Sequence, residues 1–386
     1  MRLGWLWVGI GLSLSASAQQ NDSVYWHRYI QPVTVSEDSI VVSFPLLDTL
    51  VTEYEFFFSA EEHWKTINTR IQLALLLHLH QKAGVRNLIL EGGYSYGFLI
   101  NRFLETGDDR LLRRALTDLP VCPDDLEEMF ESIYVFNQQL PPEDRIKVTG
   151  IDLEYSPELS LQTIHTLLPD SEPPAIIGSY ISEVVSLHRS KYTDPKATRR
   201  FFRRFATHLS VHQRTYATWW GADYEIVKMI VDNTLMGYRF NILRASLFQQ
   251  SWQEREAQMY QNFLQLQSRM QPGRYFAQFG ALHTDIHRSP SWEFPTLANR
   301  LNNTPSSPVA DKVFTISRYI RKMPARYEAS RDYESLRQMI SHVDDQFPRK
   351  VVLCNLIGES SPFQELSRNF QCLILIDPML ESASCE

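Results

Sequence analysis

Six acidic and histidine residues occupy the same kind of position in the chain, at or just after an apolar run typical of a buried strand. They are Glu61, His63, Glu91, Asp152, Glu154 and His283. Because the carboxyl ends of parallel strands meet at one edge of a sheet, residues far apart in the sequence converge there. A carboxylate beside an imidazole orients the ring and raises its pKa, as general base catalysis requires. The pattern favours an active site at this edge over a purely structural polar rim.

The stretch Val85–Gly107 contains a second possible chemistry beside Glu91. Residues 93–97 read Gly-Tyr-Ser-Tyr-Gly, which matches the G-x-S-x-G turn that presents a nucleophilic serine between a strand and a helix. A serine hydrolase built on Ser95 would take its partners from Asp152 or Asp285 and from His283, His287 or His342. The sequence marks out no choice among these partners, and no HGGG-type oxyanion loop precedes Ser95. We therefore rank Ser95 second, behind the histidine and carboxylate cluster.

The elements that must position these residues are predicted to alternate between strands and helices. Apolar or aromatic runs predict strands near residues 54–58, 85–90, 145–151, 274–279, 313–320, 351–356 and 372–376. The first two are joined by an amphipathic pattern around residues 67–79. Strands and helices with short connections indicate a parallel sheet. We predict an α/β fold: a mostly parallel central sheet with helices on both faces and a helical insertion, about residues 155–271, over the strand carboxyl ends.

The N-terminus has the features of an export signal. Arg2 gives a positive start, Leu3–Leu14 an apolar run, and Ala16-Ser17-Ala18 a small-residue cleavage site. We expect residues 1–18 to be a signal peptide, residues 19–50 an irregular lead-in that could include an edge strand, and residues 51–386 a single domain. The expected location is periplasmic or extracellular, with no membrane span after signal cleavage.

Composition narrows the range of partners. The chain has 386 residues, a formal net charge of −7 and 44% hydrophobic residues. Mild acidity with scattered Lys and Arg argues against nucleic acid and favours a small-molecule substrate. Cys354 and Cys372 lie in successive apolar runs, where a disulfide is possible but two buried thiols are favoured. None of the cysteines has zinc-site spacing, and we assign no residue as a metal ligand.

The pattern around residues 253–270 is helical and carries polar residues on one face. Arg255, Met259 and Asn262 stand at i, i+4 and i+7. The pattern alone favours an exposed arginine and asparagine beside one core methionine. In the functional interpretation Arg255 and Asn262 point into the cleft, where the guanidinium binds a carboxylate or stabilises an oxyanion.

Five short motifs, taken in order, resemble those of the erythromycin esterase family. They are Ala60-Glu61-Glu62-His63, Leu88-Ile89-Leu90-Glu91, Gly150-Ile151-Asp152, Arg255-Glu256 through Met259 and Asn262, and Gly280-Ala281-Leu282-His283. The resemblance spans roughly Tyr54 to His283. The wider fold group includes ChaN-like haem-binding proteins and TIKI-type proteases. Two positions depart from the family pattern, because the glycines that flank its Glu-x-His motif are Ala60 and Trp64 here.

The resemblance implies an esterase-like hydrolase that is metal-independent or weakly metal-assisted and acts on an ester, lactone or related bond. His63 would act as general base on a water, oriented by Glu61. Glu91 would position the water or the second histidine, and His283 would assist the leaving group or the oxyanion. The expected substrate-binding residues are Arg255, Asn262, Asp152 and Glu154. A non-enzymatic alternative is a haem- or divalent-metal-binding protein with His283 or Tyr94 as ligand.

Overall fold

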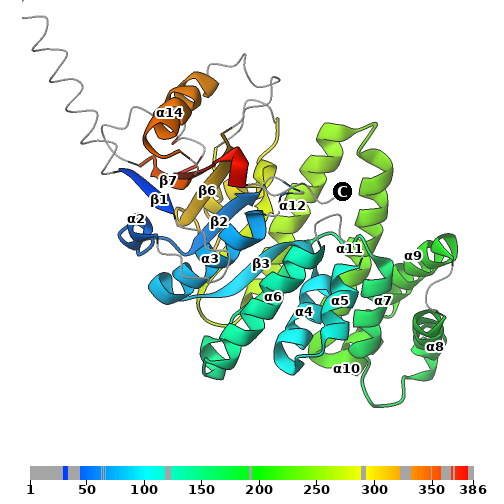
Figure 1. Ribbon diagram of the computed structural model, residues 1–386. Coiled ribbons are helices and arrows are strands. Elements are labelled where there is room, and N and C mark those ends of the chain that lie inside the picture. The colour runs from blue at the N-terminus through cyan, green and yellow to red at the C-terminus, as the bar shows by residue number, and fades with distance from the viewer. Residues whose placement is uncertain are drawn as a thin grey trace, which may run out of the picture.

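The computed structural model describes residues 29–33, 44–61, 63, 65, 67–117, 123–190, 194–287, 293–321, 332–348, 350–357, 367 and 370–380. Eight strands in this part of the chain form one sheet, in the order β1-β7-β8-β6-β2-β5-β3-β4 (Figure 1). The strands are β1 (Ile30–Val33), β2 (Phe56–Glu61), β3 (Val85–Gly93), β4 (Lys147–Asp152), β5 (Arg274–Gly280), β6 (Val313–Ile320), β7 (Val351–Asn355) and β8 (Cys372–Ile376). The pairs from β8 through β6, β2, β5 and β3 to β4 are parallel, whereas β7 runs antiparallel to both β1 and β8. The predicted mostly parallel α/β fold is confirmed.

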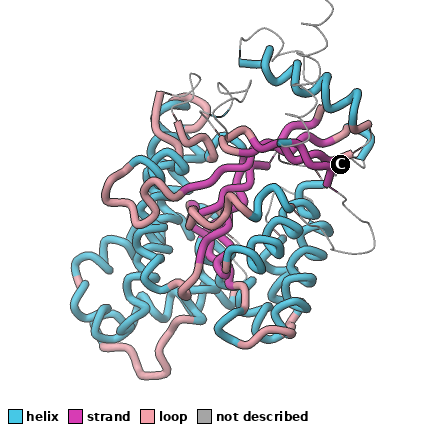
Figure 2. Tube along the Cα trace, turned by 90° about the vertical axis from the view of Figure 1, so that its left-hand side faces the viewer, coloured by secondary structure: helices cyan, strands magenta, loops and turns pink. Residues whose placement is uncertain are grey.

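The sheet forms a central layer with helices packed on both faces (Figure 2). On one face lie α3 (Ile67–Ala83), α4 (Tyr94–Thr106), α5 (Asp109–Leu116) and α6 (Pro123–Gln138). Successive residues of β2 show why both faces are covered: Phe57 packs with these helices, and Phe56 and Phe58 pack on the opposite side. A parallel strand buried on both faces is apolar at nearly every position, as the sequence of β2 is.

The opposite face is covered by the predicted helical insertion and by α13 (Leu297–Asn303). The insertion consists of α7 (Pro157–Thr166), α8 (Ala175–Arg189), α9 (Pro195–Val211), α10 (Gln213–Trp220), α11 (Tyr224–Leu243) and α12 (Phe248–Leu266). Most of it packs against the sheet face, through apolar contacts with Phe56, Ile89 and Ile151. The insertion also borders the strand carboxyl ends, as predicted: its first residues, including Leu159 of α7, line the site cavity together with residues of α11, α12 and their connection.

The expected lead-in contributes an edge strand and a short helix, α2 (Pro45–Asp48). Strand β1 pairs with β7 at the edge of the sheet and contains Pro32, which has no N–H to donate and is tolerated at an edge. The folded domain therefore includes part of the lead-in. The expected signal peptide, residues 1–18, lies outside the described residues. Within the described part, no helix is long and apolar enough to cross a membrane.

Cys354 and Cys372 are buried free thiols. Their strands are antiparallel neighbours, but Cys354 lies opposite Leu373 and Cys372 lies opposite Asn355. This one-residue offset turns the two side chains to opposite faces of the sheet, Cys354 toward α14 (Asp332–Gln346) and Cys372 toward the α3–α6 face. Burial raises the pKa of the Cys354 thiol to about 12. The favoured prediction of two buried thiols is confirmed.

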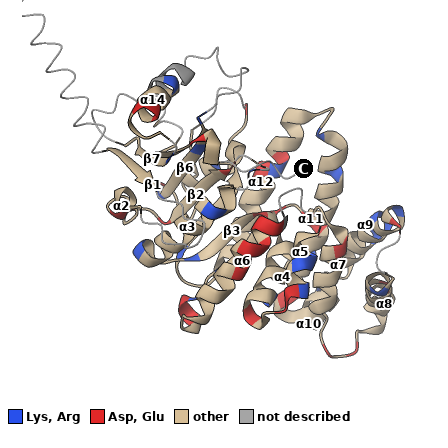
Figure 3. Cartoon of the chain, viewed as in Figure 1, with Lys and Arg blue, Asp and Glu red and all other residues tan. Residues whose placement is uncertain are grey.

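Charged residues of both signs are spread along the helices (Figure 3). The charged residues of α5 are mainly basic, and those of the adjacent α6 are acidic. Mixed charge of this kind accords with the modest formal net charge of −7.

Candidate active site

The candidate residues come from the carboxyl ends of four neighbouring strands. In the order β2, β5, β3 and β4, these strands deliver Glu61 with His63, then His283, Glu91 and Asp152. Glu61 and Asp152 are the last residues of their strands, and His283 lies in the short 3-10 turn Ala281–His283 after β5. The structure thus brings together residues that are up to 222 positions apart (283 − 61).

A β-bulge positions Glu91. In the β3–β4 pairing Leu90 lies opposite Gly150 and Gly93 opposite Asp152, so Glu91 and Gly92 face a single residue. A bulge redirects the side chain that it carries, and bulges are common beside active sites. The Glu91 carboxylate turns toward β5, where its Oε2 accepts the backbone N–H of Gly280 at 2.7 Å.

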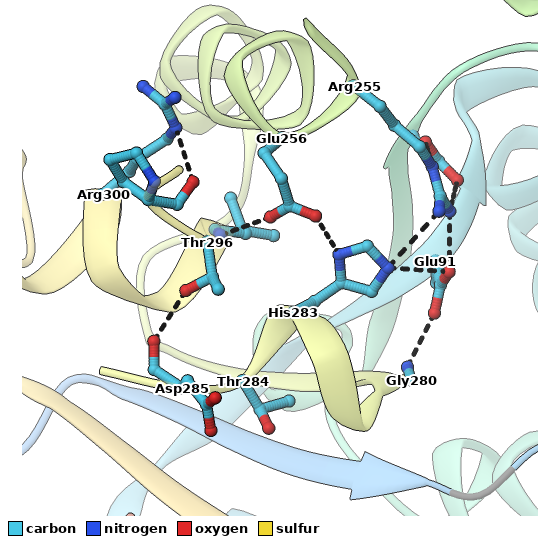
Figure 4. A network of polar contacts seen from close by, with 12 residues as sticks. Glu91, Arg255, Glu256, Gly280, His283, Thr284, Asp285, Thr296 and Arg300 are labelled. Carbon is cyan, nitrogen blue, oxygen red and sulfur yellow. Dashed lines mark hydrogen bonds and ion pairs between the residues drawn. The ribbon is translucent and has the colours of Figure 1, made fainter. Parts of the chain in front are cut away.

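Arg255 joins two of these carboxylates in the interior (Figure 4). Its Nε and Nη2 donate to the two oxygens of Asp152, at 3.0 and 2.5 Å, and Nη2 also donates to Glu91 Oε1 at 2.6 Å. Arg255 is 6% exposed and Asp152 is 1% exposed. Burial raises the pKa of Glu91, but the charges of His283 and Arg255 outweigh burial and lower it well below its usual value. Glu91 is therefore ionised at neutral pH.

His283 lies between two carboxylates. Its Nδ1 contacts Glu256 Oε1 and its Nε2 lies 3.1 Å from Glu91 Oε1. Burial opposes protonation of the ring, but the charges of Glu256 and Glu91 outweigh it and raise the pKa of His283 to about 10. The ring is therefore an imidazolium that donates from both nitrogens. At 2% exposed it lies behind Glu91 and is not among the residues that line the cavity, where it was expected to assist the leaving group or the oxyanion.

Glu256 belongs to the same buried cluster and was not predicted from the sequence as a site residue. Its Oε2 accepts the backbone N–H of Leu297, the first residue of α13, at 2.5 Å, while Oε1 holds His283. The sequence carried one signal, an acidic residue directly after Arg255 in the resembling motif. Two adjacent charges on a helix usually face solvent, but here both are buried.

His63 and Glu61 form the accessible pair of the site. His63 Nδ1 and Glu61 Oε1 are 2.8 Å apart, and the imidazole side chain is 48% exposed. Two amides, Gln72 Nε2 and Gln278 Nε2, donate to Glu61 Oε2 at 2.9 and 3.1 Å. Burial raises the pKa of Glu61, but the hydrogen bond from His63 and the other contacts outweigh it and lower the pKa. The hydrogen bond to Glu61 in turn raises the pKa of His63 above 6.5.

Gly280 lies beneath both His63 and Glu91. A Cβ atom at this position would be 2.9 Å from His63 Nε2 and 3.3 Å from Glu91 Oε2. The two polar atoms therefore approach the same point above β5, and only glycine leaves that point open. Gly280 of the Gly-x-x-His motif thus leaves a space between His63 and Glu91, and the same motif supplies His283.

A Gly280→Ala variant is expected to fold normally and to lose activity. The added methyl group would displace the exposed His63 ring, because the ring moves more easily than the strand. A displacement of about 1 Å in a catalytic group can cost about 100-fold in rate. Thermal unfolding should change little while kcat falls, and unchanged kcat in a folded variant would show that the point above Gly280 is not used.

A cavity of about 560 Å³ opens beside this cluster. Its polar wall includes Glu61, His63, Glu91, Asp152 and Arg255. Its other walls are largely apolar and aromatic, with side chains that include Tyr96, Leu126, Phe130, Tyr155, Leu159, Phe240 and Trp252. An apolar cleft with a few convergent polar groups is the usual form of a small-molecule site.

The remaining predicted substrate-binding residues differ in placement. Asp152 lines the cavity but holds Arg255 with both oxygens. Glu154 also lines the cavity, and burial raises its pKa to about 7 although the Ser95 N–H stabilises the charged form. Asn262 does not line it: its amide donates to the backbone of Ile151 and accepts from Gln258. Asn262 therefore anchors α12 to β4, and its predicted position in the cleft is not observed.

The serine alternative does not fit the geometry. Ser95 lies in the first turn of α4, is fully buried, and donates its backbone N–H to Glu154 Oε1 at 2.9 Å. A nucleophile elbow instead exposes its serine. The glycines of the motif serve close packing, since a Cβ on Gly97 would be 2.6 Å from the backbone nitrogen of Gly150. His283 already engages both ring nitrogens and is not free to serve Ser95.

The haem- or metal-binding alternative finds little support in the site. His283 presents no open nitrogen, and Tyr94 packs beside Phe98 outside the cavity lining. Among the described residues, no group of three or more His, Cys, Asp or Glu side chains is arranged to hold a metal ion. Of the two departures from the family pattern, Ala60 is buried in β2 and Trp64 lies outside the described residues.

No protein-family model matches the chain, and no curated protein matches it significantly. Three solved structures match over nearly their whole length. The erythromycin esterase EreC, a histidine-to-asparagine mutant in its open conformation, has 11% identity and a TM-score of 0.65 and covers 92% of this chain and 98% of its own. A Bacillus cereus protein has 12% identity and a TM-score of 0.64 and covers 93% and 97%. A succinoglycan biosynthesis protein has 14% identity and a TM-score of 0.64 and covers 94% and 97%.

These matches define the class of fold. The chain has an erythromycin esterase-like α/β fold, as the five motifs indicated. At 11–14% identity the likeness concerns the fold, and the activity has to be argued from the site itself.

Proposed function

We propose that the protein is a hydrolase in which His63 activates a water to attack an ester, lactone or related acyl bond. The observation that carries this proposal is the Glu61–His63 pair beside the cavity. With its proton on Nδ1, His63 donates to Glu61 and keeps an unprotonated Nε2, which lies 2.9 Å from the point above Gly280. Glu91 Oε2 borders the same point, so a water held there would contact a base and a carboxylate.

The proposed reaction needs no group beyond those described and water. Nε2 of His63 takes a proton from the water as its oxygen bonds to the carbonyl carbon. The carbon–oxygen bond to the leaving group then breaks, and the imidazolium returns the proton to the departing alkoxide. The products are a carboxylic acid and an alcohol, or a hydroxy acid from a lactone.

Arg255 is the proposed donor to the developing oxyanion. Its Nη1 lies 3.4 Å from His283 Nε2, but a protonated imidazole cannot accept a hydrogen bond. The Nη1 hydrogens are therefore available to a substrate oxygen in the cavity that Arg255 lines. A positioned donor in a water-poor site stabilises such an oxyanion far more than it would in water.

Activity against esters and lactones tests this proposal through its pH dependence. The general base must be neutral, so kcat/KM should rise as the pH increases through the raised pKa of His63, with a midpoint above 6.5. Purified protein would be assayed on a panel of aryl esters, alkyl esters and lactones between pH 5 and pH 9. Hydrolysis of no compound, or a rate that does not fall on the acid side, contradicts the proposal.

We also propose that the protein acts outside the cytoplasm. This rests on Arg2, the apolar run Leu3–Leu14 and the small residues before Gln19. N-terminal sequencing of the protein recovered from the producing cells tests this, and a mature protein that still begins at Met1 would contradict it.

A further inference from the structure

The cavity lining includes two basic side chains that the proposed mechanism does not use, Lys65 and Arg244, and Lys65 is already engaged in an interaction of its own. Arg244 lines the cavity, follows the last residue of α11 and is exposed. Among the interactions of the described residues its guanidinium has neither an ion pair nor a hydrogen-bond acceptor. A basic residue at a helix C-terminus is favourable in itself, by about 0.3–1 kcal/mol. That effect accounts for the residue type but not for its place beside the cavity.

The neighbouring cation, Arg255, is not available to bind an anionic group in the same way. Its charge is balanced by Asp152 and Glu91, and three rings cover it. Its guanidinium carbon lies 5.8 Å from the ring centroid of Tyr155, 5.5 Å from that of Phe240 and 5.1 Å from that of Trp252. Arg255 can offer hydrogen bonds to a neutral carbonyl, whereas Arg244 can offer an uncompensated charge.

Aromatic side chains connect Arg244 to the catalytic end. Tyr155, Phe240, Trp252 and Phe248 form a continuous row of ring contacts, which we call the aromatic rim. Trp252 also stacks on His283 at 5.9 Å. Phe240 lies on α11 and Phe248 and Trp252 on α12, two helices that lie side by side and are joined at their outer ends (Figure 1), whereas Tyr155 follows β4. Tyr155 and Phe248 are 40% and 42% exposed, so the two ends of the row are accessible from solvent.

The charges of the cavity are arranged unevenly. Its catalytic wall carries the carboxylates of Glu61, Glu91 and Asp152, which would repel an anionic group brought close to them. Of the two remaining basic side chains of the lining, Lys65 is engaged in an interaction, and Arg244 at the rim has no ion-pair partner among the described residues. An anionic molecule would therefore enter with its charged end at the rim and its uncharged portion toward His63.

We propose that Arg244 and the aromatic rim select substrates in which an apolar or aromatic body carries an anionic group away from the bond to be cleaved. A carboxylate, sulfate or phosphate would serve equally, because each accepts hydrogen bonds from a guanidinium. The claim about substrates rests on the proposed hydrolysis. The claim that Arg244 and the aromatic rim bind anionic aromatic molecules does not depend on hydrolysis, so binding and catalysis are tested separately.

Binding is measured with a matched pair of fluorescent probes. 1-Anilinonaphthalene-8-sulfonate is anionic and aromatic, and N-phenyl-1-naphthylamine has the same rings without the charge. In Arg244→Gln the Kd for the anionic probe should rise about three- to tenfold at low salt, as expected for one partly exposed charge pair. The Kd for the uncharged probe should stay constant, and Arg244→Lys should retain most of the preference.

The control is Arg239→Gln, on the same helix. Arg239 is exposed and pairs with Glu254 outside the cavity lining, so its loss changes the net charge equally without touching the site. It should leave both Kd values unchanged. An unchanged Kd for the anionic probe in Arg244→Gln, an equal loss for both probes, or an equal effect of Arg239→Gln overturns the proposal.

Catalysis is then compared on two esters of equal chain length, mono-4-nitrophenyl glutarate and 4-nitrophenyl pentanoate. The ratio of their kcat/KM values should fall about three- to tenfold in Arg244→Gln. A ratio unaffected by the substitution overturns the substrate proposal. Hydrolysis of neither ester, together with probe binding that depends on Arg244, would refute the proposed hydrolysis and support the anion-binding rim.

Discussion

Replacing His63 with alanine is expected to lower kcat/KM by about 10²- to 10⁴-fold, the usual contribution of a positioned general base. The side chain is half exposed and its one hydrogen bond is to Glu61, so its loss should leave the fold intact. Kinetics on the best ester of the panel would measure the effect, with circular dichroism to verify folding. The matched control is His188→Ala, because His188 stacks on His165 between α7 and α8 and lies outside the cavity lining.

Glu61 should act through His63 and not independently of it. Glu61→Gln would lower activity by itself, because it removes the charge that orients the ring and raises its pKa. In a His63→Ala background the same change should have almost no further effect, since residues that act as a unit are strongly non-additive. A loss of less than about tenfold in His63→Ala would be smaller than the contribution of a general base and would refute the mechanism.

Replacing Arg255 with methionine is expected to destabilise the fold by about 3–5 kcal/mol, the typical result of removing one partner of a buried ion pair. Asp152 is 1% exposed and would lose both of its hydrogen bonds from the guanidinium. Glu91 would lose its one hydrogen bond from the same group. Urea unfolding would measure the change in the free energy of unfolding. Arg239→Met is the control, because its exposed pair with Glu254 should contribute less than about 1 kcal/mol.

A second substitution identifies the cause of that loss. In Arg255→Met/Asp152→Asn the buried charge is removed together with its partner, so part of the stability should return. A loss below about 1 kcal/mol in Arg255→Met would mean that the cluster is more hydrated than its burial indicates. An unrelieved loss in the double variant would point to packing of the Arg255 stem against the aromatic rim instead.

The sequence was sufficient to predict that the site residues gather at the carboxyl ends of the parallel strands. Buried parallel strands are apolar at consecutive positions, so polar residues such as Glu91 and Asp152 stand out where the strands end. The edge strand with Pro32 was harder to locate, because a four-residue strand with one partner has little pattern. The predicted site at residues 91 and 152 followed from topology alone, whereas the structure was needed to show that Arg255 joins them.

The roles within the cluster depended on side-chain directions that periodicity does not encode. Arg255, Glu256 and Asn262 share one helix, yet they hold Asp152, His283 and the backbone of Ile151 respectively. His283 was expected to assist the leaving group or the oxyanion, but two neighbouring carboxylates hold it and keep it protonated. Such an effect depends on distances of about 3 Å, which spacing in the sequence cannot specify.

The contact between Glu256 and Leu297 links the chemistry of the site to the attachment of a helix. One carboxylate holds the imidazolium with one oxygen and the first N–H of α13 with the other (Figure 4). The protonated state of His283 therefore contributes to the attachment of α13 as well as to the electrostatics of the site. A molecule that drew α13 away from the sheet would pull on Glu256 and, through His283, on Glu91. In the protein, a displacement of α13 would thus be transmitted to the Glu91 carboxylate, which lies beside the proposed position of the attacking water.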